Sequence, residues 1–318
     1  MQHFLLSAGA RTLSLKAVFK MGEDAAYDAF RMMRWPETDG EAVCPSCGCT
    51  ESYSITSRRR FKCVGCHHQY SVTSGTIFAS RKLSFTDLLA AIVIFVNGAK
   101  GVSALQVSRD LDVQYKTAFV LSHKLREAMA LEAKGRMLDG VVEVDGAYFG
   151  GYVKPANYKE ARVDRRLVAH QTGKRQSVVV VRERGGDTNT FVGKSEAIGV
   201  AAVRNCVDAD AVIHADEASH WDALHGRNVA KRINHSVCYS DGSACTNQAE
   251  SFFSRLRRAE IGVHHHIAGP YLNAYAGEMA WREDNRREAN GTQAGMVVRS
   301  AMVSPVSRQW KGYWQRAA

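Results

Sequence analysis

The first half of the chain places apolar residues at the spacing of helices. Apolar positions between residues 88 and 96 repeat with a helical period, and Ser84 or Thr86 would cap that helix. Residues 103–111 and 115–129 predict a short and a longer helix joined by a turn. This is the outline of a helix-turn-helix, whose second helix lies in the major groove in DNA-binding proteins. An ordinary helical pair packed on the next domain would give the same pattern.

Beyond residue 140 the pattern changes to that of strands. Strands are predicted over residues 177–184, 188–193 and 211–215, and a helix over residues 196–207. The last of these strands ends at Asp216. A basic stretch without periodicity, residues 153–176, is predicted to be an exposed loop. Strands followed by a helix and a further strand predict an α/β domain.

The stretch from Val141 to Gly151 leaves two structures open. Asp145 and Gly146 lie between alternating apolar residues, which is a strong signal for a two-residue hairpin turn. The alternative is a buried strand that delivers a carboxylate to an active site, with Glu143 and Asp145 on one face because strand side chains alternate. The local pattern slightly favours the turn.

The segment CTNQAESFFSRLRRAEIG predicts an amphipathic helix, because its alanine, phenylalanine and leucine residues between 249 and 256 form one apolar stripe. Glu250 follows Asn247 by three residues and would complete a capping box with it. The other interpretation is functional. Ser254 and Arg257 share the face of Glu250 away from the stripe, and such a face suits metal and phosphate.

Composition points to a polyanionic partner. The chain has 318 residues, enough for two or three domains, and 42 Lys and Arg against 32 Asp and Glu give a formal net charge of +10. Nucleic acid leads the candidates for the partner. The longest apolar run, residues 88–96, is too short to span a bilayer, so we expect no membrane partner. We expect a soluble, cytoplasmic, nucleoid-associated protein.

Five of the eight cysteines lie between residues 44 and 66. Cys44 and Cys47 form one C-x-x-C pair and Cys63 and Cys66 another, with fifteen residues between the pairs. This spacing is typical of a structural zinc site in which four thiolates surround the metal. A disulfide pair is the alternative, and a fifth cysteine and two histidines nearby are weaker candidates for ligands. Zinc would supply much of the folding free energy of so small an element.

Basic side chains gather at three places where we expect DNA contact. A run of charge is usually a solvated face, but the basic character of the whole chain favours contact with phosphates. The candidates are Arg58, Arg59 and Arg60 between the cysteine pairs, Lys116, Lys124 and Arg126 in the second helix of the helix-turn-helix outline, and Arg257 in the amphipathic helix.

Three acids stand out in the second half: Asp145 in a predicted strand, Asp216 at the end of another, and Glu250 near the start of a helix. Carboxylates that converge on one point repel each other unless cations neutralise them, and hard oxygen ligands suit magnesium or manganese. Two such ions about 3.5 to 4 Å apart would activate a water or a 3′ hydroxyl and stabilise the leaving oxygen in phosphodiester exchange.

Five blocks, taken together and in order over residues 41–287, resemble the zinc-ribbon branch of the DDE insertion-sequence transposases. The blocks are CPSCGC with FKCVGCHHQYSVTSGTIF, VEVDGAYFGG, HADEASHWDAL, TNQAESFFSRLRR and GVHHHIAGPYLNAYAGEMAWREDNRR. The resemblance implies that Asp145, Asp216 and Glu250 form a catalytic triad. It would bind Mg²⁺ or Mn²⁺ for strand cleavage and transfer at transposon ends in double-stranded DNA. A homo-oligomer on the DNA is implied as well.

The resemblance also bears on the turn. Relatives often have a second acid directly after the first aspartate, where this chain has Gly146, and a histidine where it has Cys245. A position that accepts an acid does not require a positive φ, so the resemblance favours the strand at Asp145.

The implied fold class is α/β: an RNase H-like mixed sheet with helices, preceded by a zinc ribbon and a helical helix-turn-helix-like segment. Two other functions stay open, a zinc-ribbon DNA-binding regulator with an inactive nuclease-like domain and an RNase H-like nuclease without strand transfer. The expected domains are an N-terminal helical segment (1–40), the zinc ribbon (41–80), the helix-turn-helix-like region (81–135), the catalytic domain (140–290) and a C-terminal tail (291–318).

Overall fold

The computed structural model describes residues 4–133, 135–151, 154–164, 167–170, 172–233 and 244–316. The chain divides into two compact units. One combines Met1–Glu132 with Asn285–Ala318, and the other is Ala133–Asp284. Part of the predicted basic loop, at residues 153, 165, 166 and 171, lies outside the described ranges, and the rest of it before residue 165 is almost wholly exposed.

The first unit is built on helices that pack around α2. Nine consecutive side chains of α2, from Leu88 to Val96, are buried, and Ser84 caps the helix as predicted by accepting from the amide of Asp87. The C-terminal segment that we predicted as a tail contributes α8, which packs on α1, α2 and α4. The helices are α1 (Leu15–Arg34), α2 (Phe85–Asn97), α3 (Ala104–Asp110), α4 (Tyr115–Glu132) and α8 (Asn290–Val303).

A small three-stranded antiparallel sheet between α1 and α2 carries the cysteines. Its strands are β1 (Ser52–Ile55), β2 (Arg60–Cys63) and β3 (Gln69–Tyr70), in that order. Their apolar core is aromatic: Trp35 packs edge-on against Phe61, with ring centroids 5.7 Å apart, and Tyr70 lies beside both. So few apolar groups leave most of the stability of this element to other forces.

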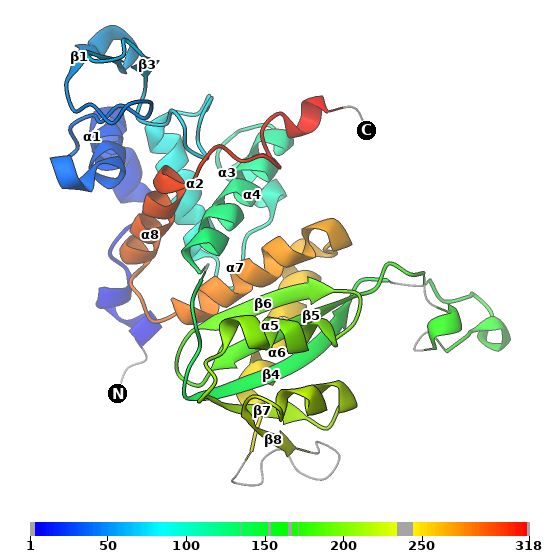
Figure 1. The fold of residues 1–318 in the computed structure, drawn as a ribbon. Coiled ribbons are helices and arrows are strands. Elements are labelled where there is room, and N and C mark those ends of the chain that lie inside the picture. Colours follow the sequence, from blue (N-terminus) through cyan, green and yellow to red (C-terminus); the bar gives the residue numbers. More distant parts are fainter. Residues whose placement is uncertain are drawn as a thin grey trace. The chain divides into compact units, whose positions relative to one another are not determined.

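The second unit is a five-stranded mixed sheet in the order β6-β5-β4-β7-β8 (Figure 1). β4 pairs antiparallel with β5 and parallel with β7, which in turn pairs parallel with β8. The strands are β4 (Val141–Phe149), β5 (Gln176–Glu183), β6 (Thr188–Gly193), β7 (Val212–Asp216) and β8 (Val229–Ile233).

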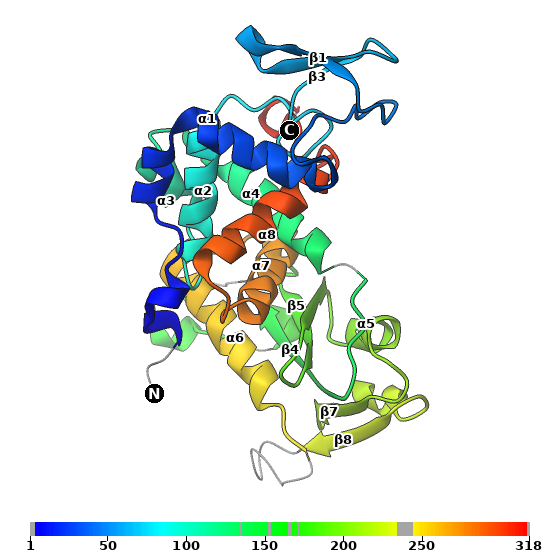
Figure 2. The ribbon, with the colours of Figure 1, turned by 90° about the vertical axis from the view of Figure 1, so that its left-hand side faces the viewer.

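Helices cover both faces of this sheet. Figure 2 shows α5 (Ile198–Cys206) on one face and α6 (Asn247–Ala259) with α7 (Leu272–Asp284) on the other. On β4 the even-numbered residues Val142 and Val144 pack with α5, whereas Ala147 and Phe149 pack with α6 and α7. The strict alternation of strand side chains therefore assigns the odd-numbered residues, including Asp145, to the face of α6.

The prediction of a hairpin turn at Asp145 and Gly146 is wrong, and the alternative prediction of a strand is confirmed. β4 runs through both residues without interruption, and they pair with Val180 and Val179 of β5. The local signal for a turn loses because pairing on both sides and two apolar faces stabilise the extended backbone. No helix within the described ranges is both long and apolar enough to cross a membrane.

The contact of α5 with the sheet provides a test of this packing. A Cβ added at Gly199 would lie 2.5 Å from the Trp221 ring and 2.9 Å from Val179, so Gly199→Ala should destabilise the second unit by about 1–3 kcal/mol through overpacking. Gly277→Ala on α7 is the matched control. Nothing lies within 4 Å of its added Cβ, and alanine should stabilise that helix by about 0.5–1 kcal/mol. Equal unfolding free energies in urea for the two variants would contradict the packing.

Candidate functional site

The four predicted zinc ligands come together at one end of the small sheet. The Sγ atoms of Cys44, Cys47, Cys63 and Cys66 all lie within 4.8 Å of one another. Two tight knuckles bring them there, since the amide of Gly48 donates to the carbonyl of Cys44 and the amide of Cys66 points at the Sγ of Cys63.

The thiols fit zinc by distance as well as by chemistry. Cys44 Sγ lies 3.6 Å from Cys66 Sγ, and Cys47 Sγ lies 3.5 Å from Cys63 Sγ. A zinc ion with bonds of about 2.3 Å to four tetrahedral sulfurs separates those sulfurs by about 3.8 Å. The weaker candidate Cys49 lies outside this set, with its Sγ 3.7 Å from the carbonyl of Glu51.

The structure separates the basic residues expected to contact DNA into exposed and packed groups. Arg58, Arg60 and Lys116 are exposed in the first unit, and Arg257 is exposed on α6 in the second. Lys124 is half-buried on α4, and burial lowers the pKa of its ammonium group. The DNA contacts expected of the exposed group stay a prediction, since exposure alone leaves these side chains open to phosphates.

Two of the arginines serve the fold instead. Arg126 is only 2% exposed, and its guanidinium lies over the Phe95 ring at 5.3 Å, so its expected DNA contact is corrected to a packing role. Arg59 forms ion pairs with Glu23 at 3.0 Å and with Asp24 on α1, which ties the small sheet to that helix. A count of basic residues did not reveal this, because packing and ion pairing depend on partners that lie elsewhere in the sequence.

Asp145 and Asp216 are neighbours in the sheet. In the parallel register of β4 and β7, Glu143 pairs with His214 and Val144 with Ala215, so the next step sets Asp145 opposite Asp216. Paired residues of adjacent strands lie about 5 Å apart and point to the same face. Ile213 and Ala215 pack on the α5 side, which leaves Asp216 on the α6 side with Asp145.

Glu250 reaches the same face from the first turn of α6. Thr246 precedes the helix as its N-cap residue, its side chain makes no capping hydrogen bond, and Asn247 is already inside the helix. The predicted capping box of Asn247 and Glu250 is therefore not formed, and that prediction is wrong. The buried stripe of α6 packs on the sheet, and Glu250, outside that stripe, is half-buried.

Electrostatics couples these carboxylates. Burial raises the pKa of Asp145 to about 7, and the negative charges of Asp216, Glu196 and Glu250 act in the same direction, against a hydrogen bond from the amide of Gly146. Among the residues that the structure describes, only the four cysteines bring three or more potential ligand atoms within 4.8 Å of one another. The carboxylate oxygens are thus spaced more widely than the thiols.

Sequence reasoning missed Glu196. A Cβ at Gly146 would lie 2.4 Å from its Cγ, so Glu196 fills the space that the glycine leaves open on the α5 side of β4. Burial raises the pKa of Glu196, and the charge of Asp216 adds to the effect while Arg175 opposes it. No local pattern predicts this contact, because it joins residues far apart in the sequence.

The cysteine cluster predicts a metal dependence confined to the ribbon. The double variant Cys63→Ser, Cys66→Ser should lose zinc and bind DNA more weakly, because hydroxyls do not replace thiolates around zinc. The second unit has its own apolar core, which includes a tryptophan, and should stay folded. Urea denaturation followed by tryptophan fluorescence should show the same unfolding transition for this core as in wild type. Elemental analysis that finds no zinc in the intact protein, purified without chelators, would count decisively against the site.

The raised pKa of Asp145 predicts a pH dependence of stability. The folded state holds this proton more tightly than the unfolded chain, where an aspartate titrates near pH 3.9. The stabilising contribution is complete below about pH 4 and is lost as the pH rises through about 7. Without added divalent cation, wild type should therefore lose unfolding free energy relative to Asp145→Asn between pH 5 and pH 8. An equal difference at both pH values in urea denaturation would contradict the raised pKa.

Comparison with protein families agrees with this geometry. Residues 137–284 match the ISXO2-like transposase domain, and residues 21–69 match the transposase zinc-ribbon domain. No curated protein matches the chain. The matched catalytic family covers nearly the whole second unit, and the ribbon family covers the cysteine cluster with the part of α1 that Arg59 contacts. With both domains in one chain and in this order, the chain matches the zinc-ribbon DDE transposases of insertion sequences in its ribbon and in its transposase domain.

Proposed function

We propose that the chain cleaves and joins DNA at insertion-sequence ends with Asp145, Asp216 and Glu250 as its catalytic triad. The observation that carries this proposal is the parallel register of β4 and β7, which pairs Val144 with Ala215 and whose next step would set the two aspartates side by side on one face. Glu250 adds a carboxylate from the helix that covers this face, and its charge acts on Asp145.

Magnesium or manganese is the proposed catalytic ion. Carboxylate oxygens are the hard ligands that these ions prefer, and a bound divalent cation would offset both the burial and the neighbouring negative charges that raise the pKa of Asp145. Two bound ions would activate a water or a 3′ hydroxyl and stabilise the leaving oxygen. The three carboxylates hold the ions. Arg257, two turns beyond Glu250 on α6, offers its exposed guanidinium to the DNA backbone.

The first unit is the proposed DNA-binding part. Arg58 and Arg60 on the ribbon supply phosphate contacts, as does Lys116 in the first turn of α4. In a helix-turn-helix, the N-terminal residues of the second helix contact base edges, and α3 with α4 has this outline. Each chain offers one triad, and two ends have to be joined, so we propose that at least two copies assemble on the DNA.

Charge-neutral variants of the triad test the catalytic proposal. Asp145→Asn, Asp216→Asn and Glu250→Gln should fold, retain zinc and bind transposon-end DNA, yet lose magnesium-dependent cleavage by at least about a thousandfold, because an amide binds a divalent cation poorly. The matched control is Asp210→Asn, an exposed carboxylate in the loop before β7, which should cleave like wild type. Near-normal cleavage by a well-folded Glu250→Gln protein would remove Glu250 from the triad.

The same assay separates the alternatives. Incubation with labelled end DNA and a target plasmid yields joined products if a 3′ hydroxyl is the nucleophile, and nicked ends alone if water is. Joined products support transposition, nicked ends alone support a nuclease without strand transfer, and binding without either product supports a regulator.

A further inference from the structure

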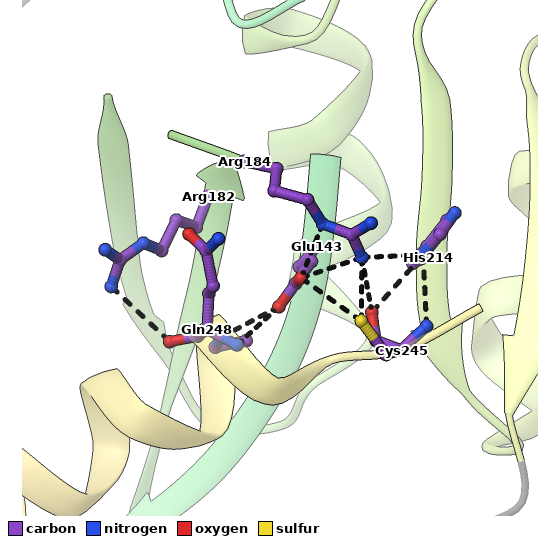
Figure 3. Close-up of polar contacts among 7 residues, drawn as sticks. Glu143, Arg182, Arg184, His214, Cys245 and Gln248 are labelled. Carbon is purple, nitrogen blue, oxygen red and sulfur yellow. Dashed lines mark hydrogen bonds and ion pairs between the residues drawn. The ribbon is translucent and has the colours of Figure 1, made fainter. Parts of the chain in front are cut away.

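Glu143 is a buried carboxylate that the triad does not use. It lies on β4 two residues before Asp145, on the same face, and no part of it is exposed. Its Oε2 accepts hydrogen bonds from the amides of Gln248, at 2.7 Å, and Ala249, at 3.1 Å (Figure 3). These are the two residues directly before Glu250, so one carboxylate joins the strand of Asp145 to the helix of Glu250.

This contact replaces the missing cap of α6. The first amides of a helix have no partner inside the helix, and a side chain just before the helix usually satisfies one of them. Here the Thr246 side chain makes no such bond, and Glu143 satisfies two amides from the neighbouring strand. Its negative charge also lies at the positive end of the helix dipole.

Arg184 balances the charge that Glu143 adds beside the triad. Its Nε and Nη2 donate to Glu143 Oε1 at 3.1 and 3.0 Å, and Nη2 also lies 3.4 Å from the carbonyl oxygen of Cys245. Without this guanidinium, a further uncompensated carboxylate would stand two residues from Asp145 and strengthen the repulsion there. Arg184 therefore holds both Glu143 and the segment that leads into α6.

His214 repeats the arrangement on the other catalytic strand. It pairs with Glu143 across β4 and β7, and it stands two residues before Asp216. Its Nδ1 accepts a hydrogen bond from the amide of Cys245 at 3.1 Å, which fixes the chain just ahead of α6 (Figure 3). Both strands that carry a catalytic aspartate thus contact the start of α6 through the residue two positions upstream.

We propose that Glu143, Arg184 and His214 form a clamp that sets the position of Glu250 relative to Asp145 and Asp216, and hence the geometry of the metal-binding carboxylates. The three are positioning residues. The inference rests on the proposed function of the triad, and it follows from where the contacts fall: on residues 245, 248 and 249, all within the five positions before Glu250. Groups that orient metal ligands typically change metal affinity 10–100-fold when they are removed.

Manganese binding to zinc-loaded full-length protein tests the clamp, with free Mn²⁺ measured by electron paramagnetic resonance. Glu143→Gln keeps the size of the side chain but loses its charge, and it should weaken Mn²⁺ binding about 10–100-fold. Excess Mn²⁺ should restore part of its cleavage activity. The matched control is Glu278→Gln, which removes the charge of another buried carboxylate in the same unit, paired with Arg282 at 2.8 Å on α7. It should bind Mn²⁺ like wild type even if it unfolds at a lower temperature.

The outcomes distinguish the clamp from the triad. If Glu143→Gln binds Mn²⁺ like wild type while Glu250→Gln has lost binding, the clamp is overturned and the triad stands. If Glu250→Gln also binds Mn²⁺ normally, the proposed function falls and the clamp with it. Equal weakening in Glu143→Gln and Glu278→Gln would reduce Glu143 to a general contribution to stability and overturn the clamp.

A second pair of variants decides the matter if Glu143→Gln does not fold. His214→Asn keeps an acceptor close to the position of Nδ1, whereas His214→Leu removes it and leaves the amide of Cys245 without this partner. Mn²⁺ affinity near that of wild type in the first variant and clearly weaker in the second supports the clamp. Equal affinities in the two variants would overturn it.

Discussion

The parallel pairing of β4 with β7 is the constraint on which the second unit depends. Side chains alternate along a strand, so a slip of one residue would move every apolar group of β4 to the opposite face and turn Asp145 away from Asp216. The register is fixed by burial on both sides, since Val142 and Val144 are enclosed with α5 and Ala147 and Phe149 with α6. The apolar core therefore places the charged groups.

Placing several carboxylates close together on one face costs free energy of folding, and the groups around them limit this cost. Asp145 and Asp216 stand together in partly buried positions, and the pKa of Asp145 rises to about 7 as a result. A third acid on the same face, Glu143, does not add to this cost, because two helix amides and the Arg184 guanidinium compensate it. The fold thus compensates the charge of Glu143 itself, whereas the function that we propose requires a cation to neutralise the other carboxylates.

Periodicity and spacing predicted what depends on neighbours in the sequence. The sequence predicted the helices around residues 88–96 and 115–129, the strand ending at Asp216 and the four-cysteine cluster. Each of these follows from local repeats or from ligand spacing. Contacts between residues far apart in the chain could not be predicted from the sequence. Asp145 and Gly146 carry a strong turn signal that pairing with β5 overrides, and Glu196 meets Gly146 only because α5 folds back on the sheet. The sequence alone does not distinguish Arg126 from an exposed basic residue, because its contact with the Phe95 ring forms only in the folded chain.

The DNA contacts that we propose differ in whether they supply affinity for DNA or specificity for its sequence. We propose that the exposed Arg58 and Arg60 on the ribbon and Arg257 near Glu250 contact phosphates in any sequence, so that they would hold DNA without selecting it. Selection of the correct ends then requires groups that reach base edges. The first turn of α4 is exposed at Tyr115, Lys116 and Thr117, and this is where the second helix of a helix-turn-helix reads the major groove. Because the ribbon and α4 lie in one unit and the carboxylates in the other, the recognition of an end and its cleavage that we propose would depend on different cores.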